Sequence, residues 1–259
     1  MTEATTTGSA VSAAARHPDA DTALSPDEAM AAPLSADAAV TAPPAVSRAA
    51  GSTLAELAAL SPPARRLLAA ADELFFRQGA VATTVREITA ACGLSPAALY
   101  NHFSSKDELL YWLVMYRHRL LAAALDDALA TADPDPVSQL RTVVEVYVQV
   151  HMQANARRGA RVANREFRSL GGAQLAEVVS IRRQLRDRVR QILAEGADLG
   201  VFSICGGNDP GSVTVAAATI LDMCIQAAEW LRDDGDLDLQ QLQARYVAMA
   251  LRLVGADST

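Results

Sequence analysis

Residues 79–110 read GAVATTVREITAACGLSPAALYNHFSSKDELL and decide the fold of this 259-residue chain. Thr84 and Glu87 have the spacing of a capping box, which predicts that a helix begins there. Ser95 is followed by a proline and predicts a second helix start, because a hydroxyl cap before a proline is a typical helix N-terminus. Gly93 lies between them and can take the left-handed conformation that a tight turn requires. The segment therefore predicts two short helices joined by a tight turn, the second of them too small and exposed to be core.

Helix signals continue on both sides of this segment. Ser61 precedes a proline and opens a helix that Gly79 ends, while Ser105 and Glu108 form a further capping box that opens a long helix. No stretch alternates convincingly as a strand, so the sequence predicts an all-α fold. Besides the two short helices, the expected helices cover residues 53–60, 62–78, 105–130, 137–156, 160–170, 173–199, 212–231 and 239–254.

Composition divides the chain into three parts. Residues 1–50 consist mainly of Ala, Thr, Ser, Pro and Asp, with almost no large apolar side chains. Such a segment cannot bury enough surface to offset the entropy cost of ordering it. We therefore expect a disordered tail over 1–50, a helix-turn-helix domain over 53–110 and a larger C-terminal helical domain over 111–255.

The remaining bulk properties bound the compartment. Hydrophobic residues make up 51% of the chain, yet no run approaches the ~20 apolar residues needed to span a bilayer. The N-terminus lacks the charged-then-apolar order of a secretory signal. The three cysteines are scattered and fit neither a disulfide framework nor a zinc site. We expect a cytoplasmic protein with no membrane partner, no bound metal and no cofactor.

The net charge of −7 is unevenly distributed. Residues 1–50 carry six acidic residues against two arginines, a balance of −4, whereas residues 61–107 carry five basic and four acidic residues, a balance of +1. A nucleic-acid binder normally presents a basic surface. If the helix-turn-helix binds DNA, its phosphate contacts must therefore be local and partly made by neutral donors.

The segment closely resembles the DNA-binding domain of the TetR family of bacterial transcriptional regulators. The matching residues are Leu74-Phe75, Gly79, Thr83 to Ile88, Cys92 to Ser95, Leu99-Tyr100, His102-Phe103 and Ser105 to Leu109. The resemblance covers roughly Ala64 to Leu113 and departs from the family pattern at Ala97, where many members have glycine. That change can alter how closely the reading helix seats on DNA. The resemblance implies a homodimer that reads a near-palindromic operator in double-stranded DNA.

The resemblance also implies roles for individual residues. Ala97, Ala98 and Asn101 would face bases, since alanine methyls can contact thymine methyls and asparagine can pair with adenine. The remaining expected DNA-binding residues would contact phosphate or lie beside it. Tyr100 and His102 have an alternative, which is to pack within the small domain. The expected DNA-binding residues are Thr84, Arg86, Ser95, Pro96, Ala97, Ala98, Tyr100, Asn101, His102 and Lys106.

In this family the remaining helices form a variable domain that binds a small molecule and dimerises. The last two expected helices carry apolar faces, which in relatives usually pair with their symmetry mates as a four-helix bundle. Ordinary intramolecular packing is the alternative for these faces. By the resemblance we expect a homodimeric repressor that a small ligand releases from its operator, acting through the helix that opens at Ser105.

Arginine is concentrated in the expected ligand-binding domain. Residues 157–190 contain ten arginines and three acidic residues, and guanidinium groups suit phosphates and carboxylates. The motif from Arg165 to Arg168, with a later Glu229-Trp230 and Gly235, is similar to TetR-like regulators of fatty-acid and steroid breakdown that sense acyl-CoA thioesters. A solvated basic face in a chain that prefers Arg to Lys is the alternative. The expected ligand-binding residues are Tyr116, Tyr147, His151, Arg165, Phe167, Arg168 and Trp230.

Two rival functions remain open at this stage. The cluster from Arg157 to Arg190 could bind a phosphorylated substrate in an enzyme, but the sequence shows no nucleophile–base pair, glycine-rich phosphate loop or metal motif. A helical adaptor with a degenerate DNA-binding domain is the other. We therefore expect a DNA-binding regulator rather than an enzyme.

Overall fold

The computed structural model describes residues 55–152, 157–230 and 238–256. The expected tail over 1–50 and the cap expected at Thr53 lie outside these ranges. Within them every regular element is a helix, which confirms the all-α prediction. After a helical stretch over 55–59, the helices are α3 (Pro62–Gln78), α4 (Val85–Ala91), α5 (Pro96–Tyr100), α6 (Lys106–Thr131), α7 (Pro136–Met152), α8 (Arg157–Glu166), the 3-10 turn η1 (Phe167–Ser169), α9 (Gly172–Asp198), α10 (Pro210–Trp230) and α11 (Leu239–Leu253).

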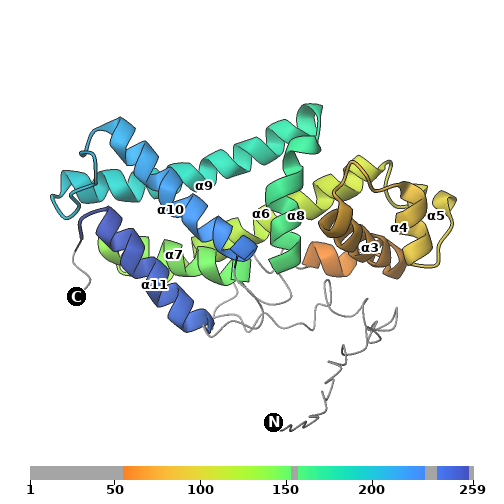
Figure 1. Ribbon diagram of the computed structural model, residues 1–259, viewed down its shortest axis with the longest axis horizontal. Helices are drawn as coiled ribbons and strands as arrows, with labels where there is room; N and C mark the ends of the chain where they lie inside the picture. The colour runs from red at the N-terminus through yellow and green to blue at the C-terminus, as the bar shows by residue number, and fades with distance from the viewer. Residues whose placement is uncertain (1–54, 153–156, 231–237, 257–259) are drawn as a thin grey trace, which may run out of the picture.

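The molecule is elongated, with a small head at one end (Figure 1). The head consists of α3, α4 and α5, and α6 runs from it into the larger body. The body packs α7, α9, α10 and α11 together, and α8 crosses between head and body (Figure 1). A long helix therefore joins a three-helix head to a larger helical domain, as the sequence predicts.

Local capping explains where the head helices begin. Thr84 Oγ1 accepts a hydrogen bond from the backbone N–H of Glu87 at 3.2 Å, and the Glu87 carboxylate accepts one from the Thr84 backbone N–H at 2.7 Å. Ser95 and Ser105 cap α5 and α6 in the simpler one-sided way. Gly93 has φ +65° in the turn between α4 and α5, where a side chain is disfavoured. The caps at Thr84, Ser95 and Ser105 and the turn at Gly93 are confirmed. The full capping box predicted for Ser105 and Glu108 is wrong in one half, because the Glu108 carboxylate accepts from the backbone N–H of Ser104 instead of that of Ser105.

Two apolar cores hold the molecule together. In the head, Ile88, Leu99 and Phe103 are buried against α3, while Val85 and Leu94 are partly buried at the edge of the same core. The second core lies in the body and centres on α7, α10 and α11. Helix α10 is long and apolar enough to cross a membrane by composition, but its inner face is part of this second core. It is accounted for as a core helix.

The contact between Gly196 of α9 and Phe202 gives a stability prediction. A Cβ at position 196 would lie 2.1 Å from Cδ2 of the buried Phe202 ring, closer than any packed carbon pair. We expect Gly196→Ala to lower the free energy of unfolding by about 1–3 kcal/mol through overpacking, despite the better helix propensity of alanine. Urea unfolding measures this. Gly171→Ala is the control, because no atom lies within 4 Å of its Cβ, and an equal loss in both variants would contradict the packing argument.

Candidate nucleic-acid interface and ligand cavity

Helix α5 presents a small exposed face. Leu99 is fully buried and fixes the helix against the head, so the opposite side faces solvent. Pro96, Ala97 and Asn101 are exposed there, and Ala98 is half-buried. Tyr100 is 58% exposed. The face is therefore short, smooth and accessible, which allows a backbone to approach base edges closely.

His102 and the residues at the start of α4 border this face. His102 is exposed, and its Nδ1 lies 3.4 Å from the Ser61 hydroxyl that caps α3. Thr84 and Arg86 are exposed at the N-terminal end of α4. The Thr84 hydroxyl also donates to Glu87 at 2.7 Å, and these hydrogen bonds lower the pKa of the Glu87 carboxyl. DNA contact by these residues remains a prediction.

Lys106 has protein partners that the sequence did not suggest. Its Nζ donates to the carbonyl of Ala80 at 2.5 Å and to that of Thr83 at 2.7 Å. The ammonium thereby closes the loop between α3 and α4 from one side. From the other side, Glu166 of α8 accepts a hydrogen bond from the Ala80 backbone N–H at 2.9 Å. A phosphate contact by Lys106 also remains a prediction, alongside this loop-holding role.

Helix α8 also holds the first helix of the head. Arg158 Nε lies 3.3 Å from Asp72 Oδ2, and its Nη1 pairs with Glu73. Asp72 is only 2% exposed, and burial raises the pKa of its carboxyl while Arg117 and Arg158 oppose the shift. The Arg161 guanidinium lies over the ring of Phe76 at 5.7 Å. Several polar contacts thus tie α8 to α3.

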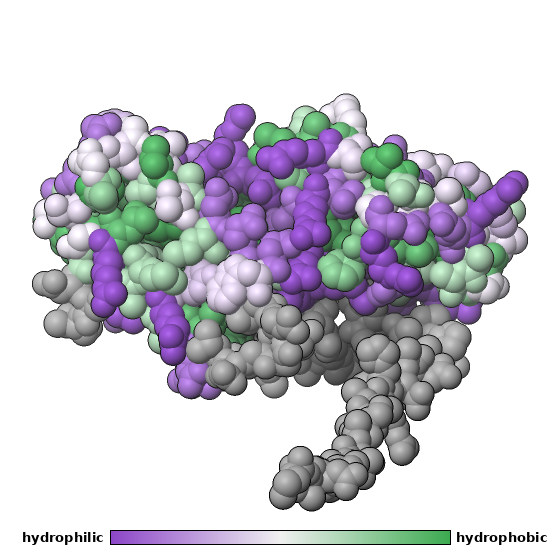
Figure 2. All heavy atoms as spheres, in the orientation of Figure 1, coloured by the Kyte–Doolittle hydropathy of each residue, from purple (hydrophilic) through white to green (hydrophobic). Residues whose placement is uncertain are grey.

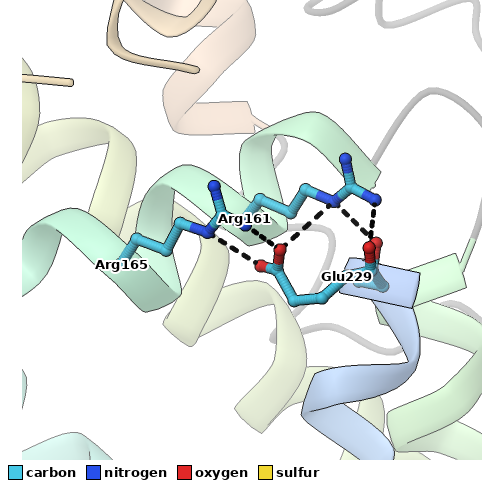
Figure 3. A network of polar contacts seen from close by, with 4 residues as sticks. Arg161, Arg165 and Glu229 are labelled. Atoms are coloured by element: carbon cyan, nitrogen blue, oxygen red, sulfur yellow. Dashed lines mark hydrogen bonds and ion pairs between the residues drawn. The ribbon is translucent and has the colours of Figure 1, made fainter. Parts of the chain in front are cut away.

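The same helix is tied to the end of α10 (Figure 3). Arg161 donates to the backbone carbonyls of Ala228 at 2.6 Å and Glu229 at 3.1 Å. Arg165 grips the Glu229 carboxylate with two nitrogens, one of them at 3.1 Å. The Arg161 guanidinium thereby satisfies two carbonyls at a helix C-terminus, where cations are favourable. Figure 2 shows the hydrophilic side chains that gather over this middle region of the molecule.

A cavity of about 150 Å³ lies in the body beside α8. Residues from α6, α7, α8, α9 and α10 line it, among them Ala160, Ala163 and Asn164 of α8. Of the seven residues expected to bind ligand, Tyr147 and His151 line the cavity.

The other five expected ligand residues lie elsewhere. Tyr116 stacks on Trp112 at 5.3 Å, and Arg168 covers the buried ring of Phe167. Arg165 pairs with Glu229, and Trp230 is exposed at the end of α10. Ligand contact by these five stays a prediction, but the structure gives each of them another role or place.

The histidines of the cavity are neutral. Nδ1 of His118 is 2.8 Å from the Val114 carbonyl, and Nδ1 of His151 is 2.8 Å from the Tyr147 carbonyl. Since a carbonyl only accepts, Nδ1 carries the proton and Nε2 is an acceptor in both rings. Burial lowers the pKa of each to about 4. Burial also raises the pKa of the Tyr147 phenol, so arginines and Asp222 provide the charge along the cavity wall.

Arg182 is one of the cavity residues that the sequence analysis missed, and a signal for it was present. Val178, Leu185 and Val189 are buried along the inner stripe of α9. Position 182 belongs to the same stripe by its spacing of three and four residues. An arginine on an apolar stripe is unusual unless it meets a partner or a ligand. The count of ten arginines obscured this one position.

An exposed helix on a small capped head, joined by a long helix to a larger helical body, is the arrangement of helix-turn-helix transcriptional regulators. Family models agree with this class. Residues 67–111 match the model described as "Bacterial regulatory proteins, tetR family", and residues 133–254 match "Tetracyclin repressor-like, C-terminal domain". The chain belongs to the TetR family and is a DNA-binding transcriptional regulator.

Individual relatives support the assignment. A solved regulatory protein of the tetR family from Rhodococcus RHA1 is 35% identical, with a TM-score of 0.68, and the match covers 77% of this chain and all of that one. The transcriptional repressor KstR2 of Mycobacterium tuberculosis is 26% identical over 186 residues, or 71% of this chain and 89% of KstR2. AibR, solved with isovaleryl coenzyme A and operator DNA, is 22% identical with a TM-score of 0.64 over 72% of this chain and 97% of AibR, and shows a shared fold.

Proposed function

We propose that this protein is a homodimeric repressor, released from a near-palindromic operator by a small molecule that enters the cavity of the body. One observation carries the proposal. Ala160, Ala163 and Asn164 of α8 line the cavity, while Arg158 and Glu166 of the same helix hold α3 and the loop before α4. A ligand that moves α8 therefore moves the head.

The homodimer is supported by the outer faces of the last two helices. Val215 of α10 is 67% exposed and Met249 of α11 is 43% exposed. One α5 helix reads only a few base pairs, whereas two on a two-fold axis read both halves of a palindrome. Exposed apolar side chains on two adjacent helices suit such an isologous contact. A cytoplasmic location, where operator DNA is found, belongs to the same proposal.

Size narrows the ligand class. An apolar cavity of about 150 Å³ holds a benzene-sized molecule, and the cavity here has that volume. We propose a short acyl group as the occupant, delivered as an acyl-CoA thioester from lipid or steroid catabolism. AibR, a protein of the same fold, was solved in complex with isovaleryl coenzyme A, whose acyl group is of this size class. Most of the coenzyme would lie outside the cavity.

The regulatory mechanism requires two states that differ in the separation of the two heads. The ligand favours the separation that misfits the operator, and DNA affinity falls by the ratio of ligand affinities in the two states. Helix α6 joins head to body, and α8 holds both α3 and the loop closed by Lys106. The two helices together transmit the change.

The enzyme alternative loses its motivation. It relied on the cluster from Arg157 to Arg190 as a phosphate site. Arg158, Arg161 and Arg165 of this cluster are engaged with Asp72, Glu73, Ala228 and Glu229. These three arginines connect helices, which removes them from the phosphate site that the enzyme alternative requires.

The function is tested by titrating the protein with DNA from upstream of its own gene at increasing salt concentrations. We expect a complex that survives salt better than one with unrelated DNA, because base contacts add to the salt-sensitive phosphate contacts. Sedimentation of the complex should give two protomers per operator. Equal affinity for both DNAs would favour a helical adaptor with a degenerate head.

Tyr100 gives a sharper prediction within this experiment. We expect Tyr100→Phe to weaken binding to operator and unrelated DNA alike, by about tenfold or less, because it removes one phosphate-donating hydroxyl and keeps the ring. Fluorescence anisotropy with both DNAs measures this. Lys106→Ala is measured separately, since Lys106 also holds the loop at Ala80 and Thr83. Unchanged affinity in Tyr100→Phe would remove this phenol from the interface.

A further inference from the structure

The cavity contains a positive charge without a counterion. Arg182 of α9 is partly buried, and its Nη1 donates to His118 Nε2 at 3.0 Å and to Asn164 Oδ1 at 3.2 Å. Its guanidinium carbon lies 4.5 Å from the centroid of the Phe167 ring. No carboxylate lies within 4.0 Å of Arg182 in the part of the chain that the structure describes. By contrast, Arg158 and Arg165 on α8 each pair with a carboxylate.

All three close partners of Arg182 are neutral. The His118 ring is held in the tautomer with Nδ1 protonated, because Nδ1 faces the Val114 carbonyl. Its pKa of about 4 keeps it uncharged at neutral pH. Asn164 offers only an amide oxygen and Phe167 only a ring face. Asp222 lines the cavity but is exposed, and it acts on Arg182 from beyond ion-pair distance.

A cation in this position is costly until an anion joins it. Removing a guanidinium from water costs free energy that neutral partners offset only in part. Within the described residues both hydrogen bonds of Arg182 come from Nη1, which leaves the N–H groups of Nη2 and Nε. These two N–H groups form a fork that can donate one hydrogen bond to each of two oxygens of a carboxylate or phosphate.

The opposite wall defines what else the ligand can carry. His151 uses Nδ1 for the Tyr147 carbonyl, so its acceptor Nε2 remains for a hydroxyl or amide donor. The Tyr147 and His151 rings are stacked at 5.9 Å and line the same cavity. The volume of about 150 Å³ limits the apolar body to one ring or a chain of about five or six carbons.

We propose that Arg182 is the anion anchor of this cavity and that the effector is a compact acyl compound that places an anionic oxygen group on it. The inference rests on the proposed function and specifies its ligand. The anion has two sources, the carboxylate of a free short acid or a phosphate of the corresponding CoA thioester. Both sources would place two anionic oxygens on the Arg182 guanidinium. They are distinguished by whether the free acid or the CoA thioester binds.

Isothermal titration calorimetry distinguishes these sources. The probes are the free acids isovalerate and benzoate, their neutral amides, and isovaleryl-CoA, each with wild type, Arg182→Gln and Arg183→Gln. Arg183 is the matched control, because it is the next residue of α9, is exposed and does not line the cavity. We expect at least one anionic probe to bind the wild type about tenfold or more tighter than its amide, as hydrogen bonds to charged groups imply.

Arg182→Gln should lose about tenfold or more of that affinity, and Arg183→Gln should keep it. Arg182→Lys retains the charge and should retain part of the binding, which guards against a folding defect in the glutamine variant. Equal binding by acid and amide, unchanged binding by Arg182→Gln, or no binding of any anionic probe at about 10 mM would overturn the proposal. Operator binding is measured in parallel without ligand. Its absence would refute the proposed repressor function and leave the calorimetric result on Arg182 intact.

Discussion

Ala97→Glu is expected to lower operator affinity by about 100-fold or more, because it places a carboxylate where α5 would meet the phosphate-lined groove. Ala97 is exposed in the first turn of α5, so the substitution disturbs no core contact. A carboxylate near a helix N-terminus is favourable for the helix itself. The unfolding temperature should therefore stay near that of the wild type while DNA binding is lost.

The matched control is Ala130→Glu, which adds the same charge at an exposed position near the C-terminal end of α6, far from the head. Anisotropy titrations with operator DNA compare the two variants at one salt concentration. We expect Ala130→Glu to bind operator within about twofold of the wild type, since it lies beyond the screening distance from the head. Equal affinities in the two variants would show that α5 does not enter the groove.

Arg158→Ala is expected to lower the free energy of unfolding by about 3 kcal/mol, because it leaves a buried carboxylate without its cation. Arg158 is 30% exposed on its side chain, but its partner Asp72 is 3% exposed on the same measure. Arg117 acts on Asp72 as well and moderates the loss. Chemical denaturation at neutral pH measures the change.

A second variant and a pH series show whether the buried charge is the cause. Asp72→Asn in the Arg158→Ala background should restore part of the stability, because a neutral amide needs no cation. Burial raises the folded pKa of Asp72 above its ordinary value of 3.8. The free-energy cost of the ionised Asp72 carboxylate therefore grows as pH rises from about 3.8 through the folded pKa. The difference in unfolding free energy between Arg158→Ala and the wild type should accordingly become smaller as pH falls. If this difference in unfolding free energy does not change with pH and Asp72→Asn restores no stability, the loss comes from packing instead of the buried charge.

The head was predictable because its signals are local. A capping box needs only Thr84 and Glu87, and the left-handed turn needs only Gly93, so three positions in sequence fix their own geometry. The order of these signals also identified the family. Buried positions such as Ile88 and Leu99 followed from helical spacing. The all-α architecture was therefore available before any coordinates.

The partners of the long charged side chains were not predictable. Lys106 turns to the carbonyls of Ala80 and Thr83, which requires knowing how the loop before α4 folds back. Arg165 meets Glu229, which is 64 residues further along the chain. A count of arginines treats these residues and Arg182 alike, whereas tertiary structure separates those that connect helices from those, such as Arg182 and Arg186, that line the cavity. Long-range partner choice depends on the packing of whole helices, which local patterns do not encode.

Helix α8 contributes part of the cavity wall through Ala160 and Ala163, and it holds the head through Arg158 and Glu166. A substitution at Ala160 or Ala163 that changes the shape of the cavity is therefore expected to shift Arg158 and its ion pair with Asp72 as well. Under the proposed function, ligand selectivity and the operator affinity of the ligand-free protein would therefore change together. To change the ligand specificity alone, substitutions should therefore be made in the parts of the cavity wall contributed by α7 and α10. Substitutions in α8 are expected to change operator affinity as well.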